Sequence, residues 1–393
     1  MSEWKKVSLS EMGIVSRGKS KHRPRNDTRL YGGRYPFIQT GDIGAAGLYV
    51  TDYSQTYNEE GLAQSKLWEK NTLCITIAAN IADTALLAFP ACFPDSIMGF
   101  VPHKDVANVK YVKYCFDILK KDCQQISQGT AQDNLSWKKL STIKFPCPPL
   151  EVQNRIATIL SRYDSLIENY QKQIKLLEEA AQRLYKEWFI DLHFPGHENT
   201  NITNGVPEGW EKKSIGEIGE YLNGFAFKPS DWQELGKPII KIKEMGNGVT
   251  NETPRNSGER VPAKYLIKAG DLLFSWSATL MVIIWSGEEG WLNQHLFKVT
   301  PVKGIDREFL LQSISNAIVE FQNLTTGSTM KHIQRNKLDQ VFVNVPNAEI
   351  MKRYSDISEK TRSNILSIQS QLRLLTEARD RLLPKLMSGE ITV

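Results

Sequence analysis

The chain has 393 residues, of which 41% are hydrophobic and 24% are charged, and its formal net charge is +5. This length exceeds one typical core and predicts two or three domains, and the ordinary composition excludes a wholly disordered protein. The mildly basic balance allows a nucleic-acid partner without requiring one.

Neither export nor a metal framework is indicated. No apolar run is long enough to cross a bilayer, and the first residues do not form a signal peptide. The cysteines are odd in number and form no C-x-x-C pair, which predicts reduced thiols in a cytoplasmic protein. They are Cys74, Cys92, Cys115, Cys123 and Cys147.

An internal duplication with a period near 200 residues organises the sequence. Trp4-Lys5-Lys6-Val7-Ser8-Leu9 is repeated as Trp210-Glu211-Lys212-Lys213-Ser214-Ile215, and Gly18 matches Gly224 at the same offset. Further along, the offset is fixed at 198 residues through a series of identities. These include Leu140 with Leu338, Glu151 with Glu349, Arg155 with Arg353, and Arg183 with Arg381.

The first elements contain a phosphate-loop pattern, G-x-x-x-x-G-K-[ST], over residues 13–20. A working phosphate loop lies between a buried strand and a helix, and neither flank fits, because residues 7–12 are polar and Pro24 follows in a charged stretch. The second copy keeps the glycine as Gly224 but continues with Phe225. We therefore expect a structural role for the glycine and no nucleotide site.

A basic stretch follows and suits contact with DNA phosphates, although a solvated loop is the alternative. Within it the only acidic residue is Asp27. Its cations are Arg17, Lys19, Lys21, Arg23, Arg25, Arg29 and Arg34.

Each copy begins with a domain of mixed α and β structure, which predicts an α/β (mixed α+β) fold class. Short apolar runs between turn residues predict strands at Leu73–Ile77 and Val341–Val345. Longer runs at Val109–Lys121 and Arg307–Gln322 predict helices.

A glycine-hinged polar loop ends each domain, at residues 129–138 and 326–335. The loops keep their place in both copies while their side chains differ, which is the pattern of two domains that read different half-sites; ordinary surface loops are the alternative. Gln, Asn, Lys and Arg are the residue types that read base edges. The candidate readers are Gln132, Asn134, Lys138, Lys331, His332 and Arg335, with Gln39, Thr40 and Lys243 behind them.

Right after Pro149 and Pro346, about 40 residues follow without glycine or proline and predict two long helices, roughly 60 Å each. A heptad stripe predicts that they pair as a coiled coil that separates the two domains, while packing of each stripe on its own domain is the alternative. The first seam is Ile156, Tyr163, Tyr170, Leu177 and Leu184, and the second is Ile159, Leu166 and Ala180, interrupted by Gln173.

No arrangement for catalysis is evident. The sequence has no Asn-Pro-Pro-aromatic motif for adenine methylation and no G-x-G-x-x-G after a strand. His193 and His197 have ligand-like spacing but lie in a linker without further His or Cys partners, so a solvated loop is expected.

The chain resembles, over its full length, the specificity subunit of type I restriction-modification enzymes. The motifs that carry the resemblance are Gly209-Trp210, the segment from Gly129 into Phe145-Pro146-Cys147-Pro148-Pro149-Leu150-Glu151-Val152-Gln153, Leu184-Tyr185-Lys186-Glu187-Trp188-Phe189 with Phe194-Pro195-Gly196, and Arg381–Ile391. One departure is Met351, where the first copy has Gln153.

The resemblance implies two target-recognition domains, at 1–150 and 207–347, each reading half of a bipartite gapped DNA site. It assigns 151–206 (helix and linker) and 348–393 to an antiparallel spacer of two long helices. This spacer fixes the gap, expected near one DNA turn of roughly 34 Å, and docks two methyltransferase subunits. The chain itself would bind no cofactor. S-adenosylmethionine, ATP and Mg are expected in partner subunits, the latter two with the restriction and translocase subunits.

Three alternatives stay open at this point. A related system with cleavage and methylation fused in one partner chain would use the same signature. A nucleotide-hydrolysing protein would depend on Lys19. A purely structural coiled-coil scaffold would bind no DNA.

Overall fold

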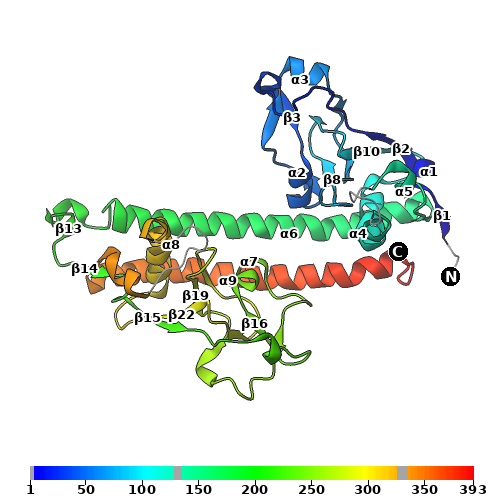
Figure 1. Ribbon diagram of the computed structural model, residues 1–393. Coiled ribbons are helices and arrows are strands. Elements are labelled where there is room, and N and C mark those ends of the chain that lie inside the picture. Colours follow the sequence, from blue (N-terminus) through cyan, green and yellow to red (C-terminus); the bar gives the residue numbers. More distant parts are fainter. Residues whose placement is uncertain (1–3, 128–134, 325–334) are drawn as a thin grey trace. The chain divides into compact units, whose positions relative to one another are not determined.

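The computed structural model describes residues 4–127, 135–324 and 335–393 (Figure 1). The chain divides into two compact units: unit 1 is Met1–Gln171 with Leu372–Val393, and unit 2 is Lys172–Gln371. The division falls inside both long helices, so each unit contains one globular domain and a part of each helix. We call the globular parts domain 1 (residues 1–150) and domain 2 (207–347).

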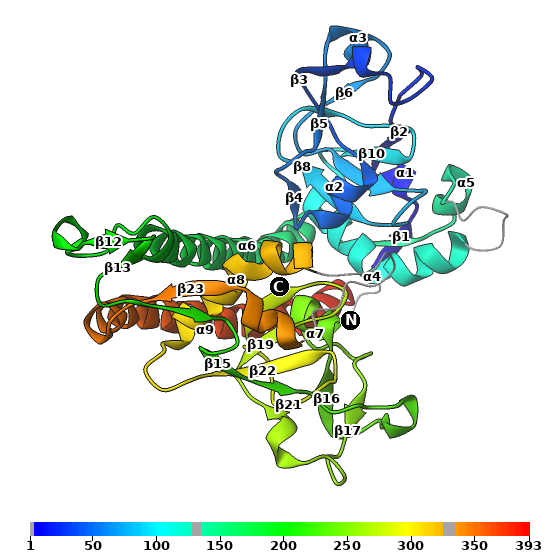
Figure 2. The same ribbon diagram turned by 60° about the vertical axis from the view of Figure 1, so that its left-hand side comes forward.

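Domain 1 consists of two small sheets and one strand pair. The larger sheet has the order β2-β10-β7-β8-β4, the smaller has the order β5-β3-β9-β6, and β1 pairs antiparallel with β11. Figure 2 shows the smaller sheet at the end of the domain away from β1. The strands are β1 (Lys5–Val7), β2 (Gly13–Arg17), β3 (Tyr31–Phe37), β4 (Tyr49–Val50), β5 (Gln55–Tyr57), β6 (Leu67–Trp68), β7 (Leu73–Thr76), β8 (Thr84–Leu87), β9 (Ala91–Cys92), β10 (Ile97–Pro102) and β11 (Phe145–Cys147). The helices are α1 (Leu9–Met12), η1 (Thr28–Leu30), α2 (Thr40–Ala45), α3 (Glu59–Ala63), α4 (Val109–Ser127) and α5 (Trp137–Leu140).

Domain 2 repeats this plan with the sheets β15-β22-β19-β20 and β17-β16-β21-β18 and the pair β14-β23. Its strands are β14 (Glu211–Ser214), β15 (Gly219–Asn223), β16 (Lys237–Ile240), β17 (Arg255–Asn256), β18 (Leu266–Ile267), β19 (Leu272–Ser275), β20 (Met281–Ile284), β21 (Gly290–Leu292), β22 (Leu296–Pro301) and β23 (Phe342–Val345). Its helices are η4 (Pro229–Asp231), α7 (Ile242–Asn247), η5 (Ala263–Tyr265), α8 (Arg307–Leu324) and η6 (Arg335–Gln340). The linker before it contains η2 (Lys186–Ile190), η3 (His197–Asn199) and the pair β12 (Ile202–Thr203) with β13 (Val206–Pro207).

The duplication expected from the sequence is confirmed strand by strand. The order β2-β10-β7-β8 in domain 1 corresponds to β15-β22-β19-β20 in domain 2, and β5-β3-β9-β6 corresponds to β17-β16-β21-β18. The turn before each central strand has a left-handed residue at the same place, Asn71 (φ 66°) and Gly270 (φ 94°). In the described residues, β4 has a counterpart in neither sheet of domain 2.

The central strand of each larger sheet is apolar because both of its faces are covered. In β7, Leu73 and Ile75 belong to the main core with Tyr111 of α4, whereas Cys74 packs in a second cluster that includes Trp68 of the smaller sheet. All four residues of β7 and of β19 are buried. This explains why these strands read as continuous apolar runs rather than as alternating ones.

The long helices α6 (Leu150–Tyr185) and α9 (Ala348–Met387) pair antiparallel within unit 1. In unit 1, the Arg379 guanidinium donates to the Asp164 carboxylate at 3.0 Å. In the same unit, Ile156 and Leu160 of α6 share a core cluster with Leu386 and Met387 of α9. Within unit 1, residue numbers therefore rise along α6 as they fall along α9, as predicted for an antiparallel pair. In unit 2, the ring of Trp188, in the η2 segment that follows α6, lies 6.0 Å from the Tyr354 ring of α9.

The packing of α6 combines both sequence-based alternatives. Ile156 and Leu160 enter the core of domain 1, where they meet Leu386 and Met387 from the end of α9. The stripe thus packs on its own domain and on the other long helix together.

The first predicted seam faces inward, with Ile156 buried and the other four positions partly buried, but the second seam is wrong. Leu166 is 45% exposed, whereas Leu160 and Ile167 are buried at 0% and 8%. Apolar residues in a heptad pattern are separated alternately by three and by four residues. The prediction placed the second seam three residues after Ile156, at Ile159. The buried residue is four positions after Ile156, at Leu160, so the predicted second seam is displaced by one residue.

A partly buried polar cluster ties domain 1 to both helices. The Tyr114 hydroxyl of α4 donates to Asp164 of α6 at 2.5 Å, and Arg379 of α9 binds the other oxygen of that carboxylate. Burial raises the pKa of Tyr114, so its hydroxyl stays a donor.

At the corresponding place in unit 2 the helix position has the opposite charge. Arg362 of α9, 198 residues after Asp164, binds Glu308 of α8 through two contacts of 2.8 and 2.9 Å. Gln312 also donates to Glu308 at 2.9 Å. The side chains of Arg362 and Glu308 are only 7% and 5% exposed.

The start of α6 depends on the fully buried Gln153. Its amide nitrogen donates to the carbonyls of Val106 and Pro148, both at 2.9 Å, and its oxygen accepts from the Asn108 amide at 3.0 Å. Gln153 therefore fixes the turn before α4 against the first turn of α6.

The start of α9 forms without a glutamine at this position. Met351 is 6% exposed within an apolar cluster that includes Ile350 and Tyr354. The Asn347 side chain accepts from the Ile350 amide at 3.0 Å and caps the helix. The departure from the family pattern therefore exchanges a polar contact for an apolar one and leaves the helix intact.

Among the described residues, no helix is both long and apolar enough to cross a membrane. All five cysteines are free thiols.

Candidate nucleic-acid interface

The basic stretch of domain 1 forms the connection from β2 to β3, and its backbone is held from several sides. The Ser65 hydroxyl donates to the Lys19 carbonyl at 2.7 Å. The Gln64 carbonyl oxygen accepts from the amides of Lys21 and His22 at 2.6 and 3.1 Å. These contacts fix the loop, so its exposed cations are presented from a rigid backbone.

The Tyr31 hydroxyl anchors the far end of the stretch by donating to the Arg25 carbonyl at 2.7 Å. Burial of the ring raises the pKa of Tyr31 to about 12. The hydroxyl therefore stays protonated and keeps this contact throughout the neutral range.

Four of the seven cations have carboxylate partners. Arg29 pairs with Asp27 at 2.7 Å, and this guanidinium holds the pKa of Asp27 well below its usual range. The sequence-based view that Asp27 alone opposes the cations is wrong, because folding adds Asp95 and Glu59. Arg25 and Arg23 approach Asp95 at 2.6 and 3.8 Å, and Arg34 approaches Glu59 at 3.0 Å.

The remaining three cations are the strongest candidates for phosphate contact. Arg17, Lys19 and Lys21 are exposed and, within the described part of the chain, belong to no ion pair. An exposed cation without a carboxylate partner can neutralise a phosphate without first breaking a contact.

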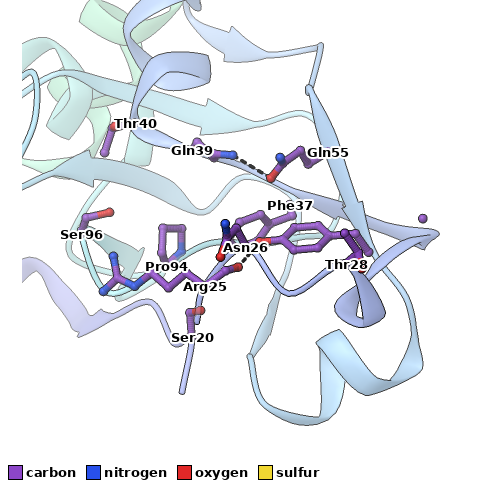
Figure 3. Close-up of a pocket in the computed structure, with 12 residues that line it drawn as sticks. Ser20, Arg25, Asn26, Thr28, Phe37, Gln39, Thr40, Gln55, Pro94 and Ser96 are labelled. Atoms are coloured by element: carbon purple, nitrogen blue, oxygen red, sulfur yellow. Dashed lines mark hydrogen bonds between the residues drawn. The ribbon is translucent and has the colours of Figure 1, made fainter. Parts of the chain in front are cut away.

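An open hollow of about 690 Å³ lies beside the basic stretch. Three of the residues predicted to contact DNA line it: Arg25, Gln39 and Thr40 (Figure 3). Its wall holds a pair of amides, in which Gln39 donates to Gln55 at 2.7 Å. Gln39 also occupies the position just before α2, where its backbone amide donates to the Asp42 carboxylate at 2.7 Å, so its backbone is held in place. The full lining is Ser20, Arg25, Asn26, Thr28, Tyr31, Gly32, Phe37, Gln39, Thr40, Gln55, Pro94 and Ser96.

Sequence reasoning missed Gln55 and Ser96 of this hollow. Both come from segments far from the basic stretch, Gln55 from β5 and Ser96 from the turn before β10. No local pattern marks them, because only the pairing of β3 with β5 and β9 brings them to the loop.

The other predicted contacts are distributed over both units. Gln132, Asn134, Lys331 and His332 lie outside the described residues. Lys138 is exposed on α5, and Arg335 is exposed at the first residue of η6.

In domain 2, Lys243 lies on α7 with its ammonium 3.5 Å from Glu252. Both side chains are well exposed, so this pair is weak and leaves Lys243 accessible.

The phosphate-loop pattern lacks the structure that it needs. Residues 13–17 are themselves a strand, and the next helical residues in the described chain are the three of η1, beginning at Thr28. A Cβ at Gly18 would lie 2.3 Å from the Pro94 carbonyl, and one at Gly224 would lie 2.1 Å from the Asn293 carbonyl. Gly18 and Gly224 therefore each allow a neighbouring backbone segment to approach closely, which is the shared structural role that the sequence predicted.

His193 and His197 lie close together in the linker, with ring centroids 5.4 Å apart. Glu187 and Glu198 approach them at 3.3 and 3.6 Å. A search of the described residues finds no group of three or more His, Cys, Asp and Glu side chains arranged to hold a metal ion.

Comparison with known proteins identifies the class. The model of the type I restriction modification DNA specificity domain matches twice, over residues 1–179 and 207–375. The chain is 25% identical to the specificity subunit of the MjaIX type I restriction enzyme of Methanocaldococcus jannaschii, over 100% of this chain and 94% of that protein. It is 24% identical to the HindI specificity subunit of Haemophilus influenzae, over 100% of both chains.

A crystal structure of a type I restriction-modification S subunit from M. genitalium has the same fold. It matches with a TM-score of 0.61 at 16% identity, over 98% of this chain and 96% of that one. Two copies of one mixed α and β domain, each with a long helix, thus define a tandem DNA specificity protein. The chain belongs to the family of type I restriction-modification DNA specificity subunits.

Proposed function

We propose that domain 1 and domain 2 each read one half of a bipartite, gapped DNA site, and that α6 and α9 set the gap between the halves. The observation that carries this proposal is the duplication itself. One scaffold is built twice, with the same strand order, while the side chains at its loops differ. A shared scaffold with different loops is suited to two different half-sites on one duplex.

The affinity for DNA would come from phosphate contacts of the basic loop, and the choice of sequence from groups around the hollow. Arg17, Lys19 and Lys21 are the candidates for the first task. The amides of Gln39 and Gln55 are candidates for the second, because side-chain amides can pair with base edges.

The catalytic work would belong to partner subunits. Docking of two methyltransferase subunits and of restriction and translocase subunits is the arrangement we expect. S-adenosylmethionine would bind to the former, and ATP with Mg to the latter. This chain would act without a catalytic site or cofactor of its own, in the cytoplasm where its DNA substrate lies.

Methylation sequencing tests the proposal directly. DNA from cells that express this chain with the methyltransferase subunit of its system is compared with DNA from cells that lack this chain. We expect a gapped motif of methylated adenine that depends on the chain. Replacement of residues 1–150 by the equivalent domain of a relative should change one half of that motif only.

The control is the methyltransferase expressed alone. A methylation pattern that does not depend on this chain, or a contiguous motif without a gap, would refute the proposal. A change in both halves after the domain replacement would refute the assignment of one half to each domain.

A further inference from the structure

Two loops occupy the same position in the duplicated fold. Loop 1 (residues 17–30) connects β2 to β3, and loop 2 (residues 223–236) connects β15 to β16. The amide of Gly18 in loop 1 donates to the Ile97 carbonyl at 2.8 Å, and the amide of Gly224 in loop 2 donates to the Leu296 carbonyl at 3.0 Å. Each loop also contains one short 3-10 turn, η1 or η4.

Loop 2 is held in place as firmly as loop 1. The Asn256 amide donates to the Asp231 carbonyl at 2.7 Å, and the Gln233 side chain accepts from the Ser257 amide at 2.7 Å. The Asp231 carboxylate in turn accepts from the Lys228 amide at 2.7 Å. Both loops therefore offer a fixed backbone, and their main difference is the chemistry of the side chains that they present.

The charges of the two loops differ sharply. Loop 1 has six cations and one acid, Asp27. Loop 2 has the cation Lys228 and the acids Asp231 and Glu234. The next cation after loop 2, Lys237, is paired with Glu289 at 2.8 Å. The counterpart of the basic loop is thus without excess positive charge.

Loop 2 presents apolar surface instead. The Trp232 side chain is 47% exposed and Leu235 is 82% exposed. The Lys241 ammonium lies 4.4 Å from the centre of the Trp232 ring, so a cation borders this apolar surface. An apolar surface bordered by a cation fits DNA, whose bases and sugars are flanked by phosphates.

We infer that the two domains hold their half-sites by different chemistry, with loop 1 binding phosphates and loop 2 binding an apolar surface of DNA through Trp232 and Leu235. This inference rests on the proposed function. The apolar surface is a thymine methyl group or a deoxyribose face, both of which accept apolar side chains. Phosphate contacts release counterions and depend steeply on salt, whereas apolar contacts do not. Loop 1 therefore contributes salt-dependent binding, and loop 2 contributes binding that is nearly independent of salt.

The test measures the affinity of the full chain, assembled with its methyltransferase subunits, for a duplex that carries the methylated motif. In the variant Arg17→Gln/Lys19→Gln/Lys21→Gln, the slope of log affinity against log salt should fall by about 2.7, at roughly 0.9 for each phosphate contact. The loss of affinity between about 50 and 200 mM salt then becomes roughly 40-fold smaller than in the wild type. The variant Trp232→Ser/Leu235→Ser should bind about 10- to 100-fold more weakly at every salt concentration, with an unchanged slope.

Matched controls replace side chains of the same type elsewhere. Lys303→Gln removes an exposed lysine from the segment after β22, and Ile14→Ser removes a side chain of β2 that is 62% exposed. Each control should leave both affinity and slope near the wild-type values. Deoxyuridine in place of thymidine in the domain 2 half-site separates the two apolar sources, because it removes only the methyl group.

Two results would overturn the inference while leaving the proposed function intact: a slope unchanged by the loop 1 variant, or an affinity unchanged by the loop 2 variant. A loop 2 variant that reduces the slope would also overturn it, since that result assigns phosphate contacts to loop 2. Failure of the wild-type complex to distinguish the motif from scrambled DNA would refute the proposed function itself.

Discussion

Removal of one partner from the buried pair Arg362–Glu308 should be among the most destabilising single changes in unit 2. The two contacts of 2.8 and 2.9 Å form a fork between guanidinium and carboxylate, and both side chains are at least nine-tenths buried. Arg362→Met leaves the Glu308 carboxylate buried, and among the described residues the neutral amide of Gln312 is then its one remaining side-chain hydrogen-bond partner. Breaking a buried pair in this way costs about 3–5 kcal/mol. That is a large part of the roughly 5–15 kcal/mol by which domains are stable.

Urea unfolding measures the effect. For an unfolding slope near 3 kcal/mol per molar urea, the midpoint should fall by about 1–1.7 M. The double variant Glu308→Leu/Arg362→Met replaces the pair with apolar side chains of similar volume, and we expect it to lie within about 1 kcal/mol of the wild type. The control is Arg353→Met, also on α9, which removes an exposed pair with Glu349 and should cost at most about 0.5 kcal/mol.

The reasoning fails if Arg362→Met costs no more than the control. It also fails if the double variant loses as much unfolding free energy as Glu308→Leu and Arg362→Met lose together. The cost of each single change would then not come from an unpaired buried charge. A midpoint that is unchanged in every variant would show that this contact forms no part of the folded core.

Three further outcomes follow from the packing. Gly18→Ala should lower the free energy of unfolding by about 1–3 kcal/mol, because the new methyl group overlaps a backbone carbonyl. The control is Gly41→Ala, where the space is open, and its melting temperature should be unchanged or slightly raised in thermal unfolding. Gln153→Met should cost about 2–4 kcal/mol in urea unfolding, since it strands the backbone groups that the buried amide satisfies; a cost below that of Arg353→Met would contradict this. Insertion of seven residues after both Gln171 and Gln371 should lengthen the spacer by about 10 Å and widen the gap in the methylation motif by roughly three base pairs; a changed half-site would count against the spacer model.

The sequence predicted the features that depend on local patterns or on the repeat. The offset of 198 residues placed both long helices, and the match of Gly18 with Gly224 predicted the structural role that both glycines have. These predictions succeeded because helix periodicity and duplication are properties of the chain itself.

The features that failed depend on contacts between distant segments. Asp95 and Glu59 pair with three of the seven cations of the basic stretch, yet Asp95 lies 70 residues from Arg25 and Glu59 lies 25 residues from Arg34. The exposed Trp232 could have been found by aligning loop 2 with loop 1, because the repeat places both after the matched glycines Gly18 and Gly224. The exposure of its side chain could not be predicted, since tryptophan is on average a highly buried residue.

The reversed charge at Asp164 and Arg362 limits how the two halves can be recombined. Glu308, the partner of Arg362, has Lys110 as its equivalent in domain 1 at the offset of 198 residues. If the two globular domains exchanged places without their helices, Glu308 would be brought toward Asp164, and Lys110 toward Arg362. Each graft would then bury like charges. A recombination boundary that transfers a new half-site specificity without loss of folding should therefore lie beyond residue 164 or 362, so that each domain keeps the helix residue that matches it.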